Sequence, residues 1–333
     1  MPRALVTGAT GFIGSHLVET LVAKNWTVTC LLREKSRADF LRKFPVRILK
    51  GPTLQPYFLE KAASGQDYVF HAAGQILAAS RKIYDQANRQ LTQHLVQACF
   101  RKNTNLKRFV YISSVSAAGP SQLHRFSDES RTPLPTSEYG RSKLRGEAEV
   151  QKLWQAVPAT IIRPPNVYGP RQKQTELLIK LITKRVVPVL KNHPHKTSLI
   201  YVKDLVNGIV QAAVSEKTKG QIYYLTDGKG YSWREIILMI KHIVLGNSLF
   251  LPIHEHSIYA LAWWSDILKR TGIRKSYFGR KAWKNMVRTS WLYSPAKAQA
   301  DFGFKPAYTL EEGIRETVQY YRIEAVPPGF MDS

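Results

Sequence analysis

The sequence predicts an α/β fold in which a doubly wound parallel sheet is joined to a smaller, mostly helical C-terminal lobe. Three observations support this prediction. Short apolar runs alternate with helical patterns over the first half of the chain, as they do in βαβ units. A glycine-rich turn follows the first apolar run, and the alternation weakens after residue 171. The chain has 333 residues, which is enough for two lobes.

The chain begins with a strand, a turn, a helix and a second strand, all within residues 4–32. The turn contains Gly8, Gly11 and Gly14. Gly8 lets the chain reverse tightly, Gly11 lets the backbone approach a pyrophosphate, and Gly14 lets the helix pack closely on the sheet. The N–H groups and the partial positive charge at the start of the helix attract phosphates. The pattern therefore predicts the first half of a dinucleotide-binding unit.

The later elements continue the alternation and then change character. The predicted strands cover residues 4–6, 26–32, 46–49, 67–71, 109–112 and 159–162, and helices cover residues 80–102 and a segment that begins near Ser137. Further on, helical patterns cover residues 173–186, 204–215, 232–244, 256–270 and 310–322, with strand-like segments at 199–202 and 221–225. We therefore predict a dinucleotide-binding Rossmann domain over 1–170 and a substrate-binding lobe over 171–333. The segment at about 199–225 is expected to return to the first domain.

The end of the second strand bears on the choice of cofactor. Leu32 and Arg33 stand where a fold that prefers NAD usually has an acidic residue for the ribose 2′-hydroxyl. Arg33, Lys35 or Arg37 would attract a 2′-phosphate, which a carboxylate would repel. We therefore predict NADP as the cofactor, with NAD as the alternative.

Three polar residues are candidates for the chemistry. Tyr139 and Lys143 share one face of a predicted helix, and Ser114 ends a strand at the edge where open α/β sheets bind ligands. An adjacent ammonium and a positively charged nicotinamide would lower the tyrosine pKa of about 10 by ~2–3 units. Tyr139 would then exchange a proton with a substrate hydroxyl, and Ser114 would donate a hydrogen bond to the reacting oxygen. Lys143 would also hold the nicotinamide ribose.

Taken together, these motifs resemble those of the extended short-chain dehydrogenases/reductases, in the NAD-dependent epimerase/dehydratase superfamily. The matching motifs are Thr7-Gly-Ala-Thr-Gly-Phe-Ile-Gly14, His71-Ala-Ala-Gly74, Val110-Tyr-Ile-Ser-Ser114, Tyr139-Gly-Arg-Ser-Lys143 and Arg163-Pro-Pro-Asn-Val-Tyr-Gly-Pro170. The resemblance implies that Ser114, Tyr139 and Lys143 form the catalytic triad. One departure is Gly51-Pro52, which stands where the family usually has Gly-Asp to contact the adenine region.

The predicted cofactor contacts come from the glycine turn, the end of the second strand, the small residues after the fourth strand, the catalytic helix and the proline-rich loop. They are Thr7, Gly8, Thr10, Gly11, Phe12, Ile13, Gly14, Arg33, Arg37, Ala72, Ala73, Gly74, Tyr139, Lys143 and Pro164. The resemblance adds Asn88, which would shape the ligand edge of the sheet. His71 is expected to be a hydrogen-bonding residue rather than a base, and no histidine or cysteine has metal-ligand spacing.

Three functions remain open at this stage. The first is an NAD(P)-dependent oxidoreductase that transfers a hydride at a secondary alcohol or ketone of a bulky substrate, like hydroxysteroid dehydrogenases and dihydroflavonol reductases. The second is a nucleotide-sugar epimerase or dehydratase with tightly bound NAD, to which Asn166 would contribute near the sugar diphosphate. The third is a non-enzymatic, cofactor-binding scaffold at a membrane surface.

The composition limits which cellular location and which binding partners we expect. The chain carries 49 Lys and Arg against 24 Asp and Glu, a net charge of +25. This charge favours an anionic small-molecule substrate or an anionic membrane surface, the latter through an amphipathic helix at 257–270. No nucleic-acid motif accompanies the charge, so nucleic acid is not an expected partner. The two cysteines and a first strand that begins at once predict a cytoplasmic protein without a signal peptide.

A second copy of the chain is a further expected partner. Family members commonly pair through the helix that carries the tyrosine, and four apolar residues on its continuation are available for this. They are Leu144, Ala148, Val150 and Leu153. Packing within the chain would explain them equally well.

Overall fold

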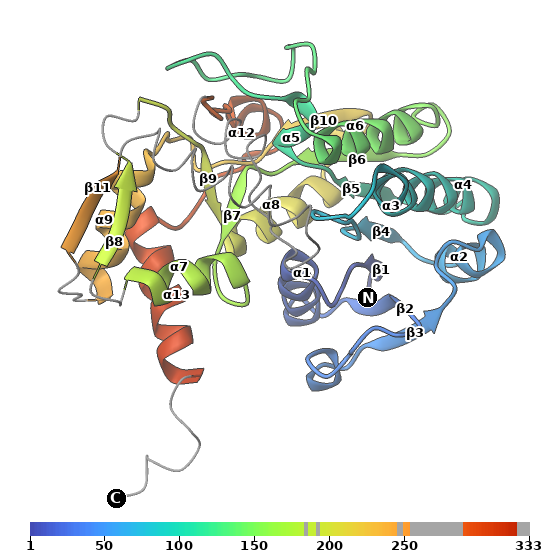
Figure 1. Cartoon of the computed structure of the whole chain (residues 1–333). Helices are drawn as coiled ribbons and strands as arrows, with labels where there is room; N and C mark the ends of the chain where they lie inside the picture. Colours follow the sequence, from blue (N-terminus) through green and yellow to red (C-terminus); the bar gives the residue numbers. More distant parts are fainter. Residues whose placement is uncertain (183–185, 191–193, 245–248, 254–288, 325–333) are drawn as a thin grey trace, which may run out of the picture.

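The computed structural model describes residues 1–182, 186–190, 194–244, 249–253 and 289–324 (Figure 1). Its centre is a seven-stranded sheet in which every neighbouring pair is parallel. Across the sheet the strands are β10 (Gln221–Tyr224), β6 (Ala159–Arg163), β5 (Arg108–Ile112), β4 (Tyr68–His71), β1 (Arg3–Thr7), β2 (Thr27–Arg33) and β3 (Arg47–Gly51). The order reverses direction at β1, with β2 on one side and β4 on the other. This confirms the predicted doubly wound fold.

Helices cover both faces of the sheet (Figure 1). Side chains alternate along each strand, so that in β1 Ala4 and Val6 pack in one core cluster and Leu5 packs in the other. The first cluster includes residues of α1 (Phe12–Ala23) and α8 (Val202–Val214). The second lies under α2 (Pro56–Ala63), α4 (Leu91–Lys102) and α6 (Glu138–Gln151).

The helix predicted over residues 80–102 consists of three pieces. It begins with α3 (Arg81–Asp85), passes through a π-helical turn at Gln86–Gln90, and continues as α4. A π-turn adds one residue to a helical turn, which an apolar spacing of about 3.6 residues does not reveal. The turn contains Asn88, which is fully buried.

The C-terminal lobe is built mostly of helices, with two small parallel sheets. Its described helices are α7 (Lys173–Ile182), α9 (Trp233–Val244), α12 (Ala296–Phe302) and α13 (Leu310–Glu324). Its small sheets pair β7 (Asn166–Tyr168) with β9 (Leu199–Tyr201), and β8 (Val186–Leu190) with β11 (Leu249–Ile253). The sequence did not predict β7, β8 or β11. The helix predicted at 256–270, with its proposed membrane-facing segment 257–270, lies outside the described residues.

One residue of the predicted dimer surface is corrected. Val150 is fully buried in the core beneath α6, where it packs with residues of α2 and α4, so a partner cannot contact it. Leu144 and Leu153 are partly buried, and Ala148 is exposed.

Candidate active site

The glycine turn packs backbone against backbone. Gly8 has φ +69°, and a Cβ there would lie 2.6 Å from the amide nitrogen of Ala73. A Cβ on Gly14 would fall on the carbonyl oxygen of Gly8. The Thr7 hydroxyl accepts a hydrogen bond from the same Ala73 amide at 3.2 Å. The turns after β1 and β4 are therefore held together, with Ala72 and Ala73 partly buried and Gly74 exposed beside them.

The N-terminus of α1 offers its N–H groups to a ligand. Its N-cap is Gly11, no described side chain caps it, and the first turn contains no acidic residue. Thr10 and Gly11 are exposed, while Phe12 and Ile13 are partly buried. A helix start with free N–H groups and no carboxylate fits a pyrophosphate.

The end of β2 presents exposed cations beside this turn. Arg33 is the last residue of β2, and Arg37 follows in the next loop; both are exposed. Neither makes an ion pair with any residue that the structure describes. Arg33 is paired across the sheet with Gly51, and a Cβ there would lie 2.6 Å from the ring of Phe58. Packing against this ring therefore explains the glycine, and the exposed Pro52 after it supplies no carboxylate.

A buried chain of hydrogen bonds runs beneath the site. His71 Nδ1 lies 2.7 Å from the Thr7 hydroxyl, and its Nε2 lies 2.9 Å from the Thr92 hydroxyl. Thr92 donates to the carbonyl oxygen of Asn88, so we assign the imidazole proton to Nε2. Burial, and then the charge of Lys143, lower the pKa of His71 to about 3. His71 is therefore neutral, as expected for a hydrogen-bonding residue.

Asn88 acts on the site through its neighbours. Its amide donates to the Gln75 carbonyl at 3.0 Å and to the Ser142 hydroxyl at 2.8 Å, and its Oδ1 accepts from the Gln75 amide. A Cβ on Gly74 would lie 2.9 Å from that oxygen. Because the side chain is fully buried, Asn88 joins the loop after β4 to α6.

The three candidate catalytic residues meet where β5 ends against the start of α6. Ser114 follows β5 and caps the short helix α5 (Val115–Ala118), and its hydroxyl is near enough to Tyr139 to influence the pKa of the phenol. Ser137 caps α6 by accepting from the Gly140 amide, which places Tyr139 in the first turn. Lys143 donates to the carbonyl oxygen of Ile112 at 2.6 Å and lies 4.4 Å from the centre of the Tyr111 ring.

The pKa values of Tyr139 and Lys143 reflect the burial of the site. Burial raises the pKa of Tyr139 to about 12, although the Ser114 hydroxyl opposes the shift. Burial also lowers the pKa of Lys143 to about 7, against the influence of Glu147. The sequence predicted a lowered tyrosine pKa. That prediction includes the charge of a bound nicotinamide; among the residues of the chain itself, burial is the largest influence and raises the pKa.

A buried ion pair next to the triad was not predicted. Glu147 and Arg163 form two hydrogen bonds, at 2.9 and 2.6 Å, and both side chains are almost inaccessible to solvent. The Ser113 hydroxyl donates to the same carboxylate, and Arg163 also donates to the Tyr224 hydroxyl at 3.1 Å. The spacing of Glu147, four residues after Lys143 on the same helix face, was the available signal.

The proline-rich loop after β6 contributes two predicted residues. Pro164 is buried, and its carbonyl oxygen accepts from the Val115 amide at 3.0 Å, which ties this loop to α5. Asn166 is exposed, and its amide donates to the Thr197 hydroxyl at 2.9 Å. Asn166 therefore lies at the start of the C-terminal lobe, on β7.

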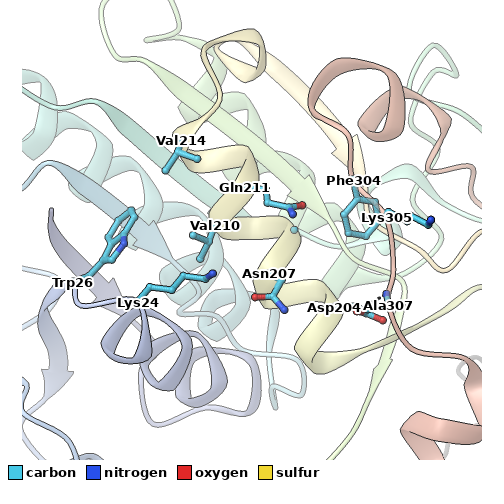
Figure 2. Close-up of a pocket in the computed structure, with 11 residues that line it drawn as sticks. Lys24, Trp26, Asp204, Asn207, Val210, Gln211, Val214, Phe304, Lys305 and Ala307 are labelled. Carbon is cyan, nitrogen blue, oxygen red and sulfur yellow. Dashed lines mark hydrogen bonds between the residues drawn. The ribbon is translucent and has the colours of Figure 1, made fainter. Parts of the chain in front are cut away.

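A pocket of about 540 Å³ opens elsewhere, along α8. Figure 2 shows Lys24 and Trp26 on one side of that helix and Phe304 and Lys305 on the other. None of the predicted site residues lines it.

Within the described residues, no group of three or more His, Cys, Asp or Glu side chains is arranged to hold a metal ion. In the same part of the chain, no helix combines the length and the apolarity that a membrane crossing requires.

Comparison with known proteins gives a consistent picture. The sequence model of the NAD dependent epimerase/dehydratase family matches residues 4–225. A ceramide reductase of Caulobacter vibrioides is 27% identical over 320 residues, covering 95% of this chain and 93% of its own. A UDP-glucose 4-epimerase of Vibrio cholerae is 26% identical, covering 96% of each chain. The structure of a UDP-glucuronic acid 4-epimerase of Bacillus cereus in complex with NAD superposes with a TM-score of 0.75 at 22% identity, over 97% of this chain and 99% of that one.

Proposed function

The chain belongs to the NAD dependent epimerase/dehydratase family, a family of NAD-dependent enzymes, and we propose that it reduces the carbonyl group of a bulky, apolar substrate with NADPH. In this proposal Tyr139 donates the proton, Ser114 donates a hydrogen bond to the reacting oxygen, and Lys143 supports both. Because the chain belongs to a family of enzymes, we set aside the hypothesis of a non-enzymatic scaffold.

One observation carries the choice of substrate class: large apolar side chains are exposed in the segment that follows β4 and in the connection from α5 to α6, the two segments that lead to Tyr84 and to the start of α6. They are Ile76, Leu77 and Ile83 after β4, and Leu123, Phe126 and Leu134 between α5 and α6. The Tyr84 hydroxyl donates to the Ile76 carbonyl at 2.9 Å, and the Tyr84 ring lies 6.4 Å from that of Tyr139. The Leu134 amide donates to the Ala118 carbonyl at 2.8 Å, which places the second loop against α5. Such a rim suits an apolar substrate better than a sugar diphosphate.

The protonated form of Tyr139 is the form that carbonyl reduction requires. With a pKa of about 12, the phenol keeps its proton at neutral pH, which is the form that carbonyl reduction consumes. A bound NADPH would supply the hydride to the carbonyl carbon. Tyr139 gives its proton to the carbonyl oxygen, so that the ketone becomes a secondary alcohol and the tyrosine is left as phenolate beside Lys143.

Two further features support the proposal. Arg33 and Arg37 are exposed at the carboxyl end of β2, where a 2′-phosphate would need them. The similarity to a ceramide reductase, although only 27% in identity, points to a large lipid-like substrate.

The runner-up is a nucleotide-sugar epimerase with tightly bound NAD. It is favoured by the similarity to UDP-glucose 4-epimerase and by the exposed Asn166 at the junction of the lobes.

The test is the consumption of NADPH, followed by absorbance, with bulky apolar ketones and separately with UDP-glucose. We expect turnover of the ketones, and a loss of ~10²–10⁴-fold in kcat for Tyr139→Phe. Tyr57→Phe is the matched control, because Tyr57 is exposed on α2 away from the triad. Conversion of UDP-glucose without net loss of NADPH, and no ketone turnover, would replace the proposal with the runner-up.

A further inference from the structure

Helix α6 and the end of β5 meet in a repeated pairing. Three residues one helical turn apart on α6 each contact one of three consecutive residues of the strand end. Tyr139 lies near Ser114, which influences its pKa, and Lys143 donates to the carbonyl oxygen of Ile112. Glu147 accepts from the hydroxyl of Ser113, the residue between them. The third pair therefore lies directly behind the two that carry the proposed chemistry.

The carboxylate of Glu147 is bound on both oxygens. Oε1 accepts from Ser113 and from Arg163 Nε at 2.9 Å, and Oε2 accepts from Arg163 Nη2 at 2.6 Å. Its side chain is 0% exposed, and that of Arg163 is 2% exposed. These bonds hold the Glu147 carboxylate in a single position, because breaking any one of them would leave a buried polar group unpaired.

The partners of Glu147 stand directly before residues of the active site. Ser113 precedes Ser114 at the end of β5, and Arg163 precedes Pro164 at the end of β6. Arg163 extends the connection to β10 through the Tyr224 hydroxyl. One carboxylate on α6 thus fixes the ends of neighbouring strands at the edge of the sheet that faces the substrate.

We propose that Glu147 is a positioning residue for Lys143 and Ser114: it holds the end of β5 in place, and its negative charge favours the ammonium form of Lys143. The inference rests on the proposed function, since it takes Lys143 and Ser114 as parts of the reacting site.

The charges around Lys143 explain why Glu147 is needed. Burial lowers the pKa of Lys143 to about 7, and the charge of Glu147 raises it from where burial alone would put it. The other titratable groups packed nearby are His71 of β4, which is neutral, Tyr111 of β5 and Tyr139 of α6, both of whose pKa values burial raises. Arg163 of β6 stays positive, because Glu147 holds its pKa above the usual range despite burial.

The first experiment compares Glu147→Gln with Glu149→Gln. Glu149 is on the same helix, is also buried and is also ion-paired, with Arg89 at 3.3 Å and Lys152 at 2.9 Å, but it contacts no residue of the triad. The loss of charge in Glu147→Gln lowers the pKa of Lys143, so the alkaline limb of the kcat profile should move down by about one pH unit or more. The KM for NADPH should stay within about threefold, and Glu149→Gln should leave the profile unchanged.

A second variant separates positioning from stability. Glu147→Leu/Arg163→Met removes both charges and replaces them with apolar groups of similar size, which often leaves stability unchanged. We expect a thermal midpoint near that of the wild type and a kcat at least tenfold lower. If the double variant has both the stability and the kcat of the wild type, the inference is overturned, because the ion pair then has only a structural role.

The proton on Lys143 can also be followed without any reaction. The pH midpoint of the Lys143 Cε chemical shift, read by NMR on protein with ¹³C-labelled lysine, reports its titration directly although the side chain is buried. A lower midpoint in Glu147→Gln supports the inference even if the protein reduces no ketone. The absence of ketone reduction would contradict only the proposed function. An unchanged midpoint together with an unchanged kcat profile would overturn the inference itself.

Discussion

The ammonium of Lys143 is bound to the carbonyl oxygen of Ile112, at 2.6 Å, two residues before Ser114. The lysine is therefore fixed by the strand that leads to the serine. Its position depends on β5 as much as on the helix that it shares with Tyr139.

Lys143→Met should lower kcat by ~10²-fold or more, since it removes the cation that stabilises the tyrosinate after proton transfer. The affinity for NADPH should also fall, because the ammonium is expected to bind the nicotinamide ribose. Steady-state kinetics and a fluorescence titration measure the two effects. Lys152→Met is the control, as an exposed lysine just beyond the same helix. A kcat within twofold of the wild type would remove Lys143 from the triad.

Gly8→Ala should be far more damaging than Gly303→Ala, although the two glycines have almost the same φ, +69° and +70°. A Cβ on Gly8 meets backbone atoms of the turn after β4, whereas a Cβ on Gly303 meets nothing within 4 Å. Gly303→Ala should therefore cost only the ~1–2 kcal/mol of the left-handed conformation. Gly8→Ala should cost clearly more and abolish cofactor binding. Urea unfolding and NADPH titration of the two variants measure these effects. An equal loss of unfolding free energy in both variants would mean that the turns after β1 and β4 separate freely.

Replacing Arg33 and Arg37 together by glutamine should weaken NADPH binding by about 10- to 100-fold, the value of a charge-assisted hydrogen bond of about 1.5–3 kcal/mol. NADH binding should change less than twofold, because NADH has no 2′-phosphate. The measurement is quenching of tryptophan fluorescence by each cofactor at two salt concentrations, and the affinity for NADPH should decrease with salt. Arg47→Gln is the control, since Arg47 lies at the opposite end of β3 from Gly51, the partner of Arg33. Tighter binding of NADH by the wild type would contradict the assignment of NADP.

The stability of the protein should fall as the pH is lowered from 6.5. Burial lowers the pKa of His71 to about 3 and that of His16 to about 4, so each takes up its proton readily only when the chain unfolds. Between pH 6.5 and the pKa of the folded protein, each histidine can lower the free energy of unfolding by up to ~1.4 kcal/mol per pH unit. In His71→Gln, the loss of unfolding free energy between pH 7 and pH 5 should be about 2 kcal/mol smaller than in the wild type. His124→Gln, with an exposed side chain, should match the wild type.

The sequence predicted the parts of the fold that depend on local pattern. The strand, glycine turn and helix at residues 4–32 are recognisable because two demands on the turn are local: Gly8 has a positive φ, and Gly14 packs directly on Gly8. The strands of the main sheet are short apolar runs, and their order follows from the alternation with helices. The strands β8 and β11 were missed, since five-residue segments in a mostly helical lobe carry no distinctive periodicity.

The sequence predicted which residues gather at the candidate site better than how they interact. Ser114, Tyr139 and Lys143 could be chosen from their spacing, but the bond from Lys143 to Ile112 involves a backbone oxygen, which no residue type reveals. The raised pKa of Tyr139 results from burial by the whole fold. Glu147 and Arg163 are 16 residues apart in sequence, and only the packing of α6 on the sheet brings them together.

The pairing of α6 with the end of β5 has a consequence for how new specificities arise. All three contacts join α6 to the end of β5 and the two residues after it. The loop between, residues 120–133, contains none of these contacts and supplies the rim of the site. That connection can change its length and composition while the reacting groups keep their alignment. Grafting this loop from a relative with another preference should thus alter which molecules are accepted and leave the chemistry intact.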